Sequence, residues 1–240
     1  MKSSSPRAII VAGPNGAGKT TQARTLLGET LRGVTYVNAD VIAQGLSGFA
    51  PESAAVEASR IMLERLRALA AQRADFAFET TLAARTYAAW LKELTQTGYS
   101  LQLFYYWLRS PDLAVARVAL RVMRGGHNIP EASVRQRYQR SIRNFFTLYR
   151  DLVHSWRIYD NSEYEFPLLI ALKDPGRYSR VAARWLAKYL EGVEGATIDE
   201  AACVAANLQA LGGRHHVTAL TALRDMSEGA ARRGERVGVA

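Results

Sequence analysis

The hydrophobic and polar positions of the chain predict strands that alternate with helices. A short apolar run at 8–12 is typical of a buried strand, and the apolar spacing turns helical from residue 18 to residue 31. The same criteria predict further strands at 35–37, 76–78, 101–108, 157–159 and 168–172, and helices near 52–73, 86–97, 112–124, 131–153 and 177–190. This alternation indicates an α/β fold with a parallel sheet covered on both faces.

Two further patterns define the second half of the chain. Between Val134 and Trp156, apolar residues recur in steps of three and four, which predicts one long amphipathic helix. After Glu191 the strand pattern ends, and two helices are expected, at 197–211 and 216–231, on either side of a Gly-Gly break. We therefore expect a main domain at 1–192 and a helical, partly disordered appendage at 193–240.

A glycine-rich motif follows the first predicted strand and opens the first predicted helix. Its sequence, Gly-Pro-Asn-Gly-Ala-Gly-Lys-Thr at 13–20, matches the P-loop pattern G-x-x-x-x-G-K-[ST]. Backbone N–H groups of such a loop surround a phosphate, the lysine reaches the β- and γ-phosphates, and the threonine hydroxyl binds Mg²⁺. A fortuitous glycine turn with a solvated lysine would not explain the flanking strand and helix. The expected nucleotide-binding residues are Gly13, Pro14, Asn15, Gly16, Ala17, Gly18, Lys19, Thr20 and Thr21, with Thr20 as the metal ligand.

Carboxylates stand where two further strands end. Asp40 follows the second strand, and we expect it to be the base that activates an acceptor hydroxyl, or else a cap of the next helix. Glu79 and Thr80 end the third strand and are expected to bind the acceptor or a metal-bound water, although a solvated strand-end glutamate is the plain alternative. A hydrophobic strand followed by aspartate, the usual second magnesium contact, is not recognised.

An arginine-rich segment predicts a lid around 117–144. Arg117, Arg121 and Arg124 share one helical face before a Gly-Gly-His hinge, and are expected to stabilise charge on the transferred phosphoryl group. A second row on the following helix consists of Arg137, Arg140 and Asn144, of which Arg137 is expected to contact the substrate. Simple solvation is the alternative for any single arginine.

The charge is concentrated in this same region. The chain has a formal net charge of +9, and the segment from Arg109 to Arg157 contains ten arginines, no lysine and three acids. Clustered arginine favours fitted phosphate contacts, so nucleic acid is not an expected partner. The single cysteine and the lack of a signal-like or membrane-spanning run predict a cytoplasmic protein without membrane contact.

Taken together, several motifs resemble the zeta toxin family of P-loop kinases. They are the P-loop, Asn-Ala-Asp at 38–40, Phe-Glu-Thr-Thr-Leu at 78–82, the arginines before Gly-Gly-His at 125–127, and Tyr-Asp-Asn-Ser at 159–162. The resemblance covers about 10–175. It implies phosphorylation of the amino-sugar hydroxyl of UDP-N-acetylglucosamine, with Lys19 on the phosphates, Asp40 as base, Glu79 near the acceptor, and Asp160 and Asn161 near the nucleotide base.

The sequence therefore predicts a kinase that uses ATP or GTP with Mg²⁺ to phosphorylate a hydroxyl of a small acceptor, with a sugar nucleotide as one candidate. One alternative is a nucleotide-dependent switch module whose 193–240 appendage contacts a partner or an antitoxin-like inhibitor. Another is a nucleic-acid end kinase, which the sequence pI of about 9.9 motivates.

Overall fold

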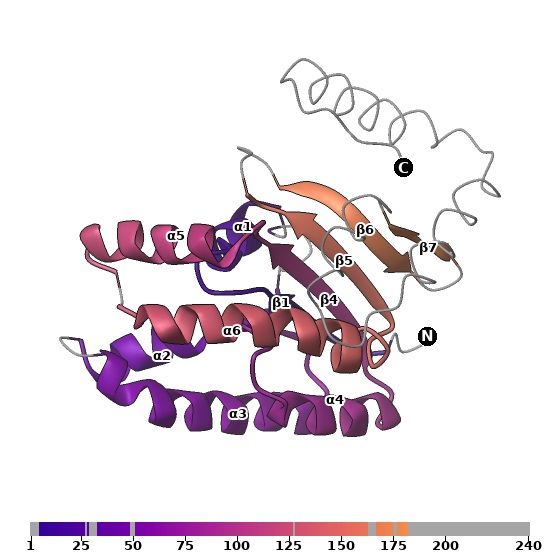
Figure 1. Ribbon diagram of the computed structural model, residues 1–240. Coiled ribbons are helices and arrows are strands. Elements are labelled where there is room, and N and C mark those ends of the chain that lie inside the picture. Colours follow the sequence, from indigo (N-terminus) through magenta and orange to yellow (C-terminus); the bar gives the residue numbers. More distant parts are fainter. Residues whose placement is uncertain are drawn as a thin grey trace, which may run out of the picture.

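A computed structural model describes residues 5–26, 28, 33–48, 51–126, 128–162, 167–174 and 177–181. The predicted helices at 197–211 and 216–231 lie outside the described residues, as does His127. The described part contains a mixed sheet with helices on both faces (Figure 1). This arrangement confirms the predicted α/β class.

The sheet has seven strands in the order β2-β3-β1-β4-β5-β6-β7. Their bounds are β1 (Arg7–Ala12), β2 (Thr35–Val37), β3 (Phe76–Thr80), β4 (Ser100–Trp107), β5 (Ser155–Asp160), β6 (Leu168–Asp174) and β7 (Arg177–Val181). The first five strands in this order pair in parallel. The carboxyl ends of β1, β2 and β3 therefore meet at one edge of the sheet.

The last two strands of the sheet are antiparallel, which the predicted parallel arrangement does not include. β6 pairs antiparallel with β5, and β7 pairs antiparallel with β6. The connection between β5 and β6, residues 161–167, is shorter than the dozen or so residues that a parallel crossover requires. The helix predicted from residue 177 is also wrong at its start, because Arg177–Val181 forms a strand, with a tyrosine and a valine that favour extended structure.

The helices connect the parallel strands. They are α1 (Lys19–Leu26), α2 (Ala39–Leu46), α3 (Ala55–Ala71), α4 (Thr86–Gln96), α5 (Pro111–Met123) and α6 (Glu131–Asn144), with a 3₁₀ turn at Pro51–Ala54. Figure 1 shows α3, α4 and α6 on one side of the sheet and α1 on the other. Among the described residues, no helix has the length and apolar character needed to cross a membrane.

The predicted long helix after residue 131 is shorter than expected. The α-helix ends at Asn144, a π-helical turn covers Phe145–Tyr149, and Trp156 lies in β5. Phe145 and Tyr149 are buried, so the apolar spacing continues through the π turn. Trp156 fits the helical spacing by coincidence. A short buried strand also contains apolar residues, and periodicity alone does not distinguish such a strand from a buried helical segment.

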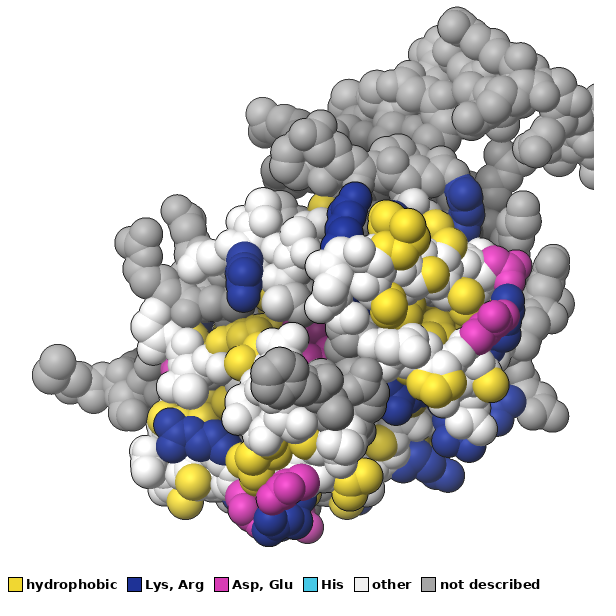
Figure 2. Space-filling model, turned by 90° about the vertical axis from the view of Figure 1, so that its left-hand side faces the viewer, with side chains coloured by type: hydrophobic (Ala, Val, Ile, Leu, Met, Phe, Trp, Pro, Cys, Tyr) yellow, Lys and Arg dark blue, Asp and Glu magenta, His cyan; other side chains and the backbone are white. Residues whose placement is uncertain are grey.

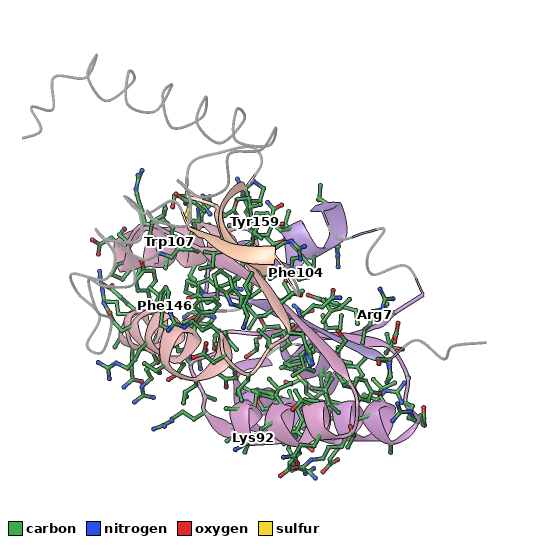
Figure 3. All side chains as sticks on the ribbon, turned by 90° about the vertical axis from the view of Figure 1, so that its right-hand side faces the viewer. Arg7, Lys92, Phe104, Trp107, Phe146 and Tyr159 are labelled. Atoms are coloured by element: carbon green, nitrogen blue, oxygen red, sulfur yellow. The ribbon has the colours of Figure 1, made fainter. Side chains whose placement is uncertain are left out.

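The core lies on both faces of the sheet. Residues 8–12 of β1 are fully buried, as a central parallel strand requires. On one face, Phe76 and Phe78 contact Trp90 of α4, and Tyr105 contacts Phe145. Figure 3 shows Phe104 and Tyr159 on one side of the sheet, with Trp107 and Phe146 toward the other.

Candidate functional site

The glycine-rich loop joins β1 to α1 and has the backbone of a phosphate cradle. Gly16 and Gly18 have φ values of +76° and +74°, a region that side chains rarely adopt. Gly13 has a φ of +141°, and a Cβ there would lie 2.1 Å from the carbonyl oxygen of Tyr106. Only glycine therefore allows the loop to pass so close to β4. The turn is closed by the Ala17 N–H, which donates to the Pro14 carbonyl at 3.2 Å.

Lys19 is the first residue of α1, and its side chain is buried, with 8% exposed. Its Nζ donates to the Pro14 carbonyl at 3.1 Å and lies 3.8 Å from Oε1 of Glu79. Burial lowers the pKa of Lys19, while the nearby carboxylates of Glu79 and Asp40 act in the opposite direction. The ammonium group is thus largely removed from water, so its attraction to an anionic ligand is strong.

Glu79 collects three hydrogen bonds on one oxygen. Its Oε2 accepts from the Thr20 hydroxyl at 2.7 Å, from the Tyr36 hydroxyl at 2.9 Å and from Nδ2 of Asn38 at 2.8 Å. The sheet register makes this possible, because Glu79 pairs with Val11 just before the glycine-rich loop. Glu79 is therefore not a solvated strand-end residue: its side chain is only 9% exposed.

Thr20 and Glu79 form a donor set that suits a hard cation. In P-loop enzymes, Mg²⁺ is held by the P-loop hydroxyl and by an acid that ends a neighbouring hydrophobic strand. Glu79 follows the buried run Phe76-Ala77-Phe78 in the strand next to β1, so it occupies that place in the sheet. The sequence contains this signal, a hydrophobic strand that ends in an acid, with glutamate in place of the usual aspartate.

Magnesium requires few ligands from a protein. No group of three or more His, Cys, Asp or Glu side chains that could hold a metal occurs among the residues the structure describes. Mg²⁺ is usually held by one or two protein oxygens together with substrate phosphates and water. The Thr20 hydroxyl and the Glu79 carboxylate provide two such oxygens beside the phosphate cradle.

Asp40 lies in the first turn of α2, at the same edge of the sheet, with its side chain exposed. The alternative role of helix cap is wrong, because Asn38 is the N-cap and its side-chain oxygen accepts from the Asp40 N–H at 2.8 Å. The Asp40 carboxylate, like that of Glu79, opposes the lowering of the Lys19 pKa by burial. Its carboxylate is open to solvent, and its role as the base stays a prediction.

The structure separates the three arginines of α5. Besides burial, which has the larger effect, the positive charge of Arg121 lowers the pKa of Lys19. Arg117 packs against Gly16, and its Nη2 donates to the Ser162 carbonyl at 2.8 Å, which ties α5 to the end of β5. Arg124 is exposed at the C-cap of α5. Arg121 is thus the member of this row whose charge acts on Lys19, and its contact with a bound phosphate stays a prediction.

The predicted second row on α6 divides in the same way. Arg137 and Arg140 are exposed, whereas Asn144 is buried and its Nδ2 donates to the Leu82 and Ala83 carbonyls at 2.7 and 3.2 Å. Two further buried contacts, Tyr105 with Ser141 and the Tyr138 hydroxyl with the Leu108 carbonyl, fix α6 to β4. Because α6 is fixed in this way, any hinge of the predicted lid should lie between α5 and α6.

The loop after β3 is held from both sides. Thr80 and Thr81 accept hydrogen bonds from the Leu82 and Ala83 N–H groups at 3.1 and 3.4 Å. Leu82 is buried with a φ of +56°, which is unusual for a residue with a side chain. Asn144 therefore stabilises a strained turn directly after Glu79, and Thr80 acts there as a turn residue in addition to its predicted contact with the acceptor.

The remaining predicted residues surround the cradle. Asn161 is buried, and its Nδ2 donates to the Ala17 carbonyl at 2.8 Å, so it supports the loop from beneath. Asn15 is also buried, and its Oδ1 has no hydrogen-bond partner. Thr21 is exposed on α1. Figure 2 shows the side of the molecule that lies at the left of Figure 1, with acidic atoms in a recess near the middle and Lys and Arg side chains around it.

Sequence comparison relates the chain to a known protein family. The sequence profile of the zeta toxin family matches residues 1–166. An uncharacterised protein of Haemophilus influenzae is 29% identical over 132 residues, which cover 55% of this chain and 92% of that protein.

Solved structures share the fold. The complex of AvrRxo1-ORF1 and -ORF2 with ATP has a TM-score of 0.66 at 17% identity, and the match covers 80% of this chain but only 66% of that one. A structure of the PezAT chromosomal toxin–antitoxin system of Streptococcus pneumoniae has a TM-score of 0.51 at 20% identity, covering 67% of this chain and 69% of that one. Since its profile matches well over half of the sequence, this chain belongs to the zeta toxin family.

Proposed function

We propose that this protein is a nucleotide-dependent phosphotransferase that transfers the γ-phosphoryl group of ATP or GTP to a hydroxyl of a small acceptor. The observation that carries the proposal is the contact between the P-loop and Glu79, which brings Lys19, Thr20 and a buried carboxylate together at one sheet edge. Membership of the zeta toxin family supports the same chemistry.

Different residues of the chain would bind the phosphates, hold the metal ion and accept the proton. The cradle N–H groups and Lys19 would bind and orient the phosphates, and Arg121 would add positive charge as the phosphoryl group is transferred. Thr20 and Glu79 would hold Mg²⁺, which when bound offsets phosphate charge. Asp40, exposed beside the cradle, would accept the proton of the acceptor hydroxyl at its carboxylate.

UDP-N-acetylglucosamine is the first acceptor to test, because the family resemblance implies it.

We also propose an antitoxin-like inhibitor as a protein partner. Family membership supports this proposal, and PezAT, which shares the fold, is a toxin–antitoxin system. A protein that is paired with such an inhibitor should be toxic without it. Expression of the protein alone should therefore slow the growth of a bacterial host, and Lys19→Ala should abolish the effect. Equal toxicity of the variant would contradict it.

The central experiment uses γ-labelled ATP and GTP with a panel of acceptors. The panel contains UDP-N-acetylglucosamine, other sugar nucleotides, free metabolites and an oligonucleotide. We expect transfer to one small acceptor, its loss in Lys19→Ala, and a fall of about 10²–10⁴-fold in Asp40→Asn, the usual contribution of a general base. Glu64→Gln, on the exposed surface of α3, is the matched control and should retain full activity.

The same experiment separates the alternatives. Phosphate release to water alone, with no acceptor labelled, would favour a nucleotide-dependent switch. Preferential labelling of the oligonucleotide would favour a nucleic-acid end kinase. Full activity of Asp40→Asn would reject Asp40 as the base while leaving the nucleotide site in place.

A further inference from the structure

Lys19 and Glu79 form a buried ion pair that is long for a charge-assisted hydrogen bond. Their closest atoms, Nζ and Oε1, are 3.8 Å apart. A charge-assisted N–H···O bond is usually about 2.7–2.9 Å long, and attraction between unit charges is strong in such surroundings. Other contacts must therefore hold the Glu79 carboxylate at this distance from Lys19.

The restraint comes from the far oxygen of Glu79. Oε2 accepts from Thr20, Tyr36 and Asn38, all at 2.7–2.9 Å. Turning the carboxylate toward Lys19 would break these bonds and leave buried donors unpaired, which is costly. Three donors on one oxygen thus oppose the pull of the lysine.

Tyr36 and Asn38 differ from Thr20 because neither belongs to the phosphate-binding loop. They are two residues apart at the end of β2, so strand alternation directs both toward the same face of the sheet. Burial, with the nearby charge of Glu79, raises the pKa of Tyr36, so its hydroxyl remains a donor. The second polar atom of Asn38, Oδ1, accepts from the Asp40 N–H, which fixes the direction of its amide.

We propose that Tyr36 and Asn38 are positioning residues that hold the Glu79 carboxylate away from Lys19, so that the lysine stays available to a nucleotide phosphate. If they were lost, Glu79 would move onto Lys19 and neutralise it. The inference rests on the proposed function for its purpose, but the movement that it predicts occurs without any ligand.

The test variant is Tyr36→Phe/Asn38→Ser. Phenylalanine removes only the hydroxyl, and serine retains an oxygen that caps α2 but is too short to reach Glu79. In a crystal structure of the ligand-free variant, we expect the distance between Nζ and Oε1 to shrink from 3.8 Å to about 2.8 Å. An unchanged distance would overturn the proposal, whether or not the protein binds nucleotides.

A binding measurement then tests the consequence. Titration calorimetry with ATP and EDTA should show at least about tenfold weaker binding in the double variant, equal to about 1.4 kcal/mol. Adding Glu79→Gln should restore the affinity to that of Glu79→Gln alone, because a neutral side chain cannot neutralise the lysine. Loss of affinity without this rescue would mean that the two residues act only on folding, and the proposal would fail.

Two controls complete the design. Tyr99→Phe removes a buried tyrosine hydroxyl that donates to the Ala74 carbonyl at 2.9 Å, and it should leave ATP affinity unchanged. If the wild-type protein binds no ATP, the proposed function fails, and the crystallographic distance alone decides the positioning role. If wild type binds ATP and the double variant binds it equally well, the positioning role fails while the proposed function stands.

Discussion

At the scale of single residues, Glu79 is the point where three parts of the chain meet. It contacts the P-loop through Thr20 and the edge strand β2 through Tyr36 and Asn38. The candidate base Asp40 is linked to the same group, because Asn38 also caps the helix that carries it. A change at Glu79 would thus reach both the nucleotide side and the acceptor side of the site.

The three α5 arginines should differ sharply in their importance. The charge of Arg121 acts on Lys19, whereas Arg124 is exposed at the helix end. We expect Arg121→Ala to lower the rate of phosphoryl transfer about 10³-fold or more, because an arginine that stabilises transition-state charge contributes about 10³–10⁵-fold. Steady-state kinetics of Arg121→Ala and of the control Arg124→Ala would check this. Equal losses in the two variants would contradict the assignment.

Lys19 should reduce the stability of the ligand-free protein. Burial lowers its pKa, so keeping the ammonium charged costs free energy in the folded state. We expect Lys19→Met to raise the free energy of unfolding by about 1 kcal/mol at neutral pH, a common trade-off at functional sites. In this variant the Glu79 carboxylate still has its three hydrogen-bond donors, Thr20, Tyr36 and Asn38.

The pH dependence of that gain follows from the sign of the shift. The cost of the charged lysine is fully present below its lowered pKa and disappears as the pH rises through that value toward the unfolded pKa. The advantage of Lys19→Met should therefore shrink at alkaline pH, as measured by urea denaturation without nucleotide. A constant or growing advantage would show that burial of the charge is not its cause.

Some of these residues could be predicted from the sequence and others could not. The P-loop has a fixed spacing because backbone geometry demands glycine at given positions, so Lys19 and Thr20 were identifiable. Tyr36 lies in a three-residue edge strand without any motif, and its role depends on a β3 residue brought beside it by pairing. The pairing of residues in two distant strands cannot be predicted from a local sequence pattern.

At the scale of elements, α6 links the core to the loop after β3. Its buried side holds β4 through Tyr138 and Ser141, and Asn144 at its end binds the Leu82 and Ala83 carbonyls. The sequence predicted the helix from its apolar spacing. It did not predict the π turn, because the buried positions Phe145 and Tyr149 continue the same spacing.

Asn144 should therefore matter more than its exposed neighbours. Asn144→Ala leaves two carbonyls without their donor, and we expect it to lower the free energy of unfolding by about 1–3 kcal/mol. Arg140→Ala, exposed on the same helix, should change it by less than about 0.5 kcal/mol. Chemical denaturation of both variants provides the comparison, and equal effects would remove the anchoring role of Asn144.

At the scale of the whole molecule, the sheet order assembles the site from distant segments. With β1 between β3 and β4, the glycine-rich loop lies beside the ends of both strands, and β2 brings Asn38 to the same edge. The alternation of strands and helices was enough to predict the α/β class. The alternation alone did not give the direction of β6, which the short connection of residues 161–167 sets, and β7 was predicted as the start of a helix.

The predicted domain boundary can be tested on the same scale. All contacts described for the candidate site involve residues between Gly13 and Ser162, and the family match ends at residue 166. We expect a chain of residues 1–192 to unfold cooperatively and to bind ATP with the affinity of the full chain, as measured by thermal unfolding and titration calorimetry. A matched truncation at 150 would remove β5 and with it Asn161, which supports the P-loop, so it should lose binding. If the 1–192 chain also lost binding while remaining folded, residues 193–240 would belong to the nucleotide site, and the division into a kinase domain and an appendage would be wrong.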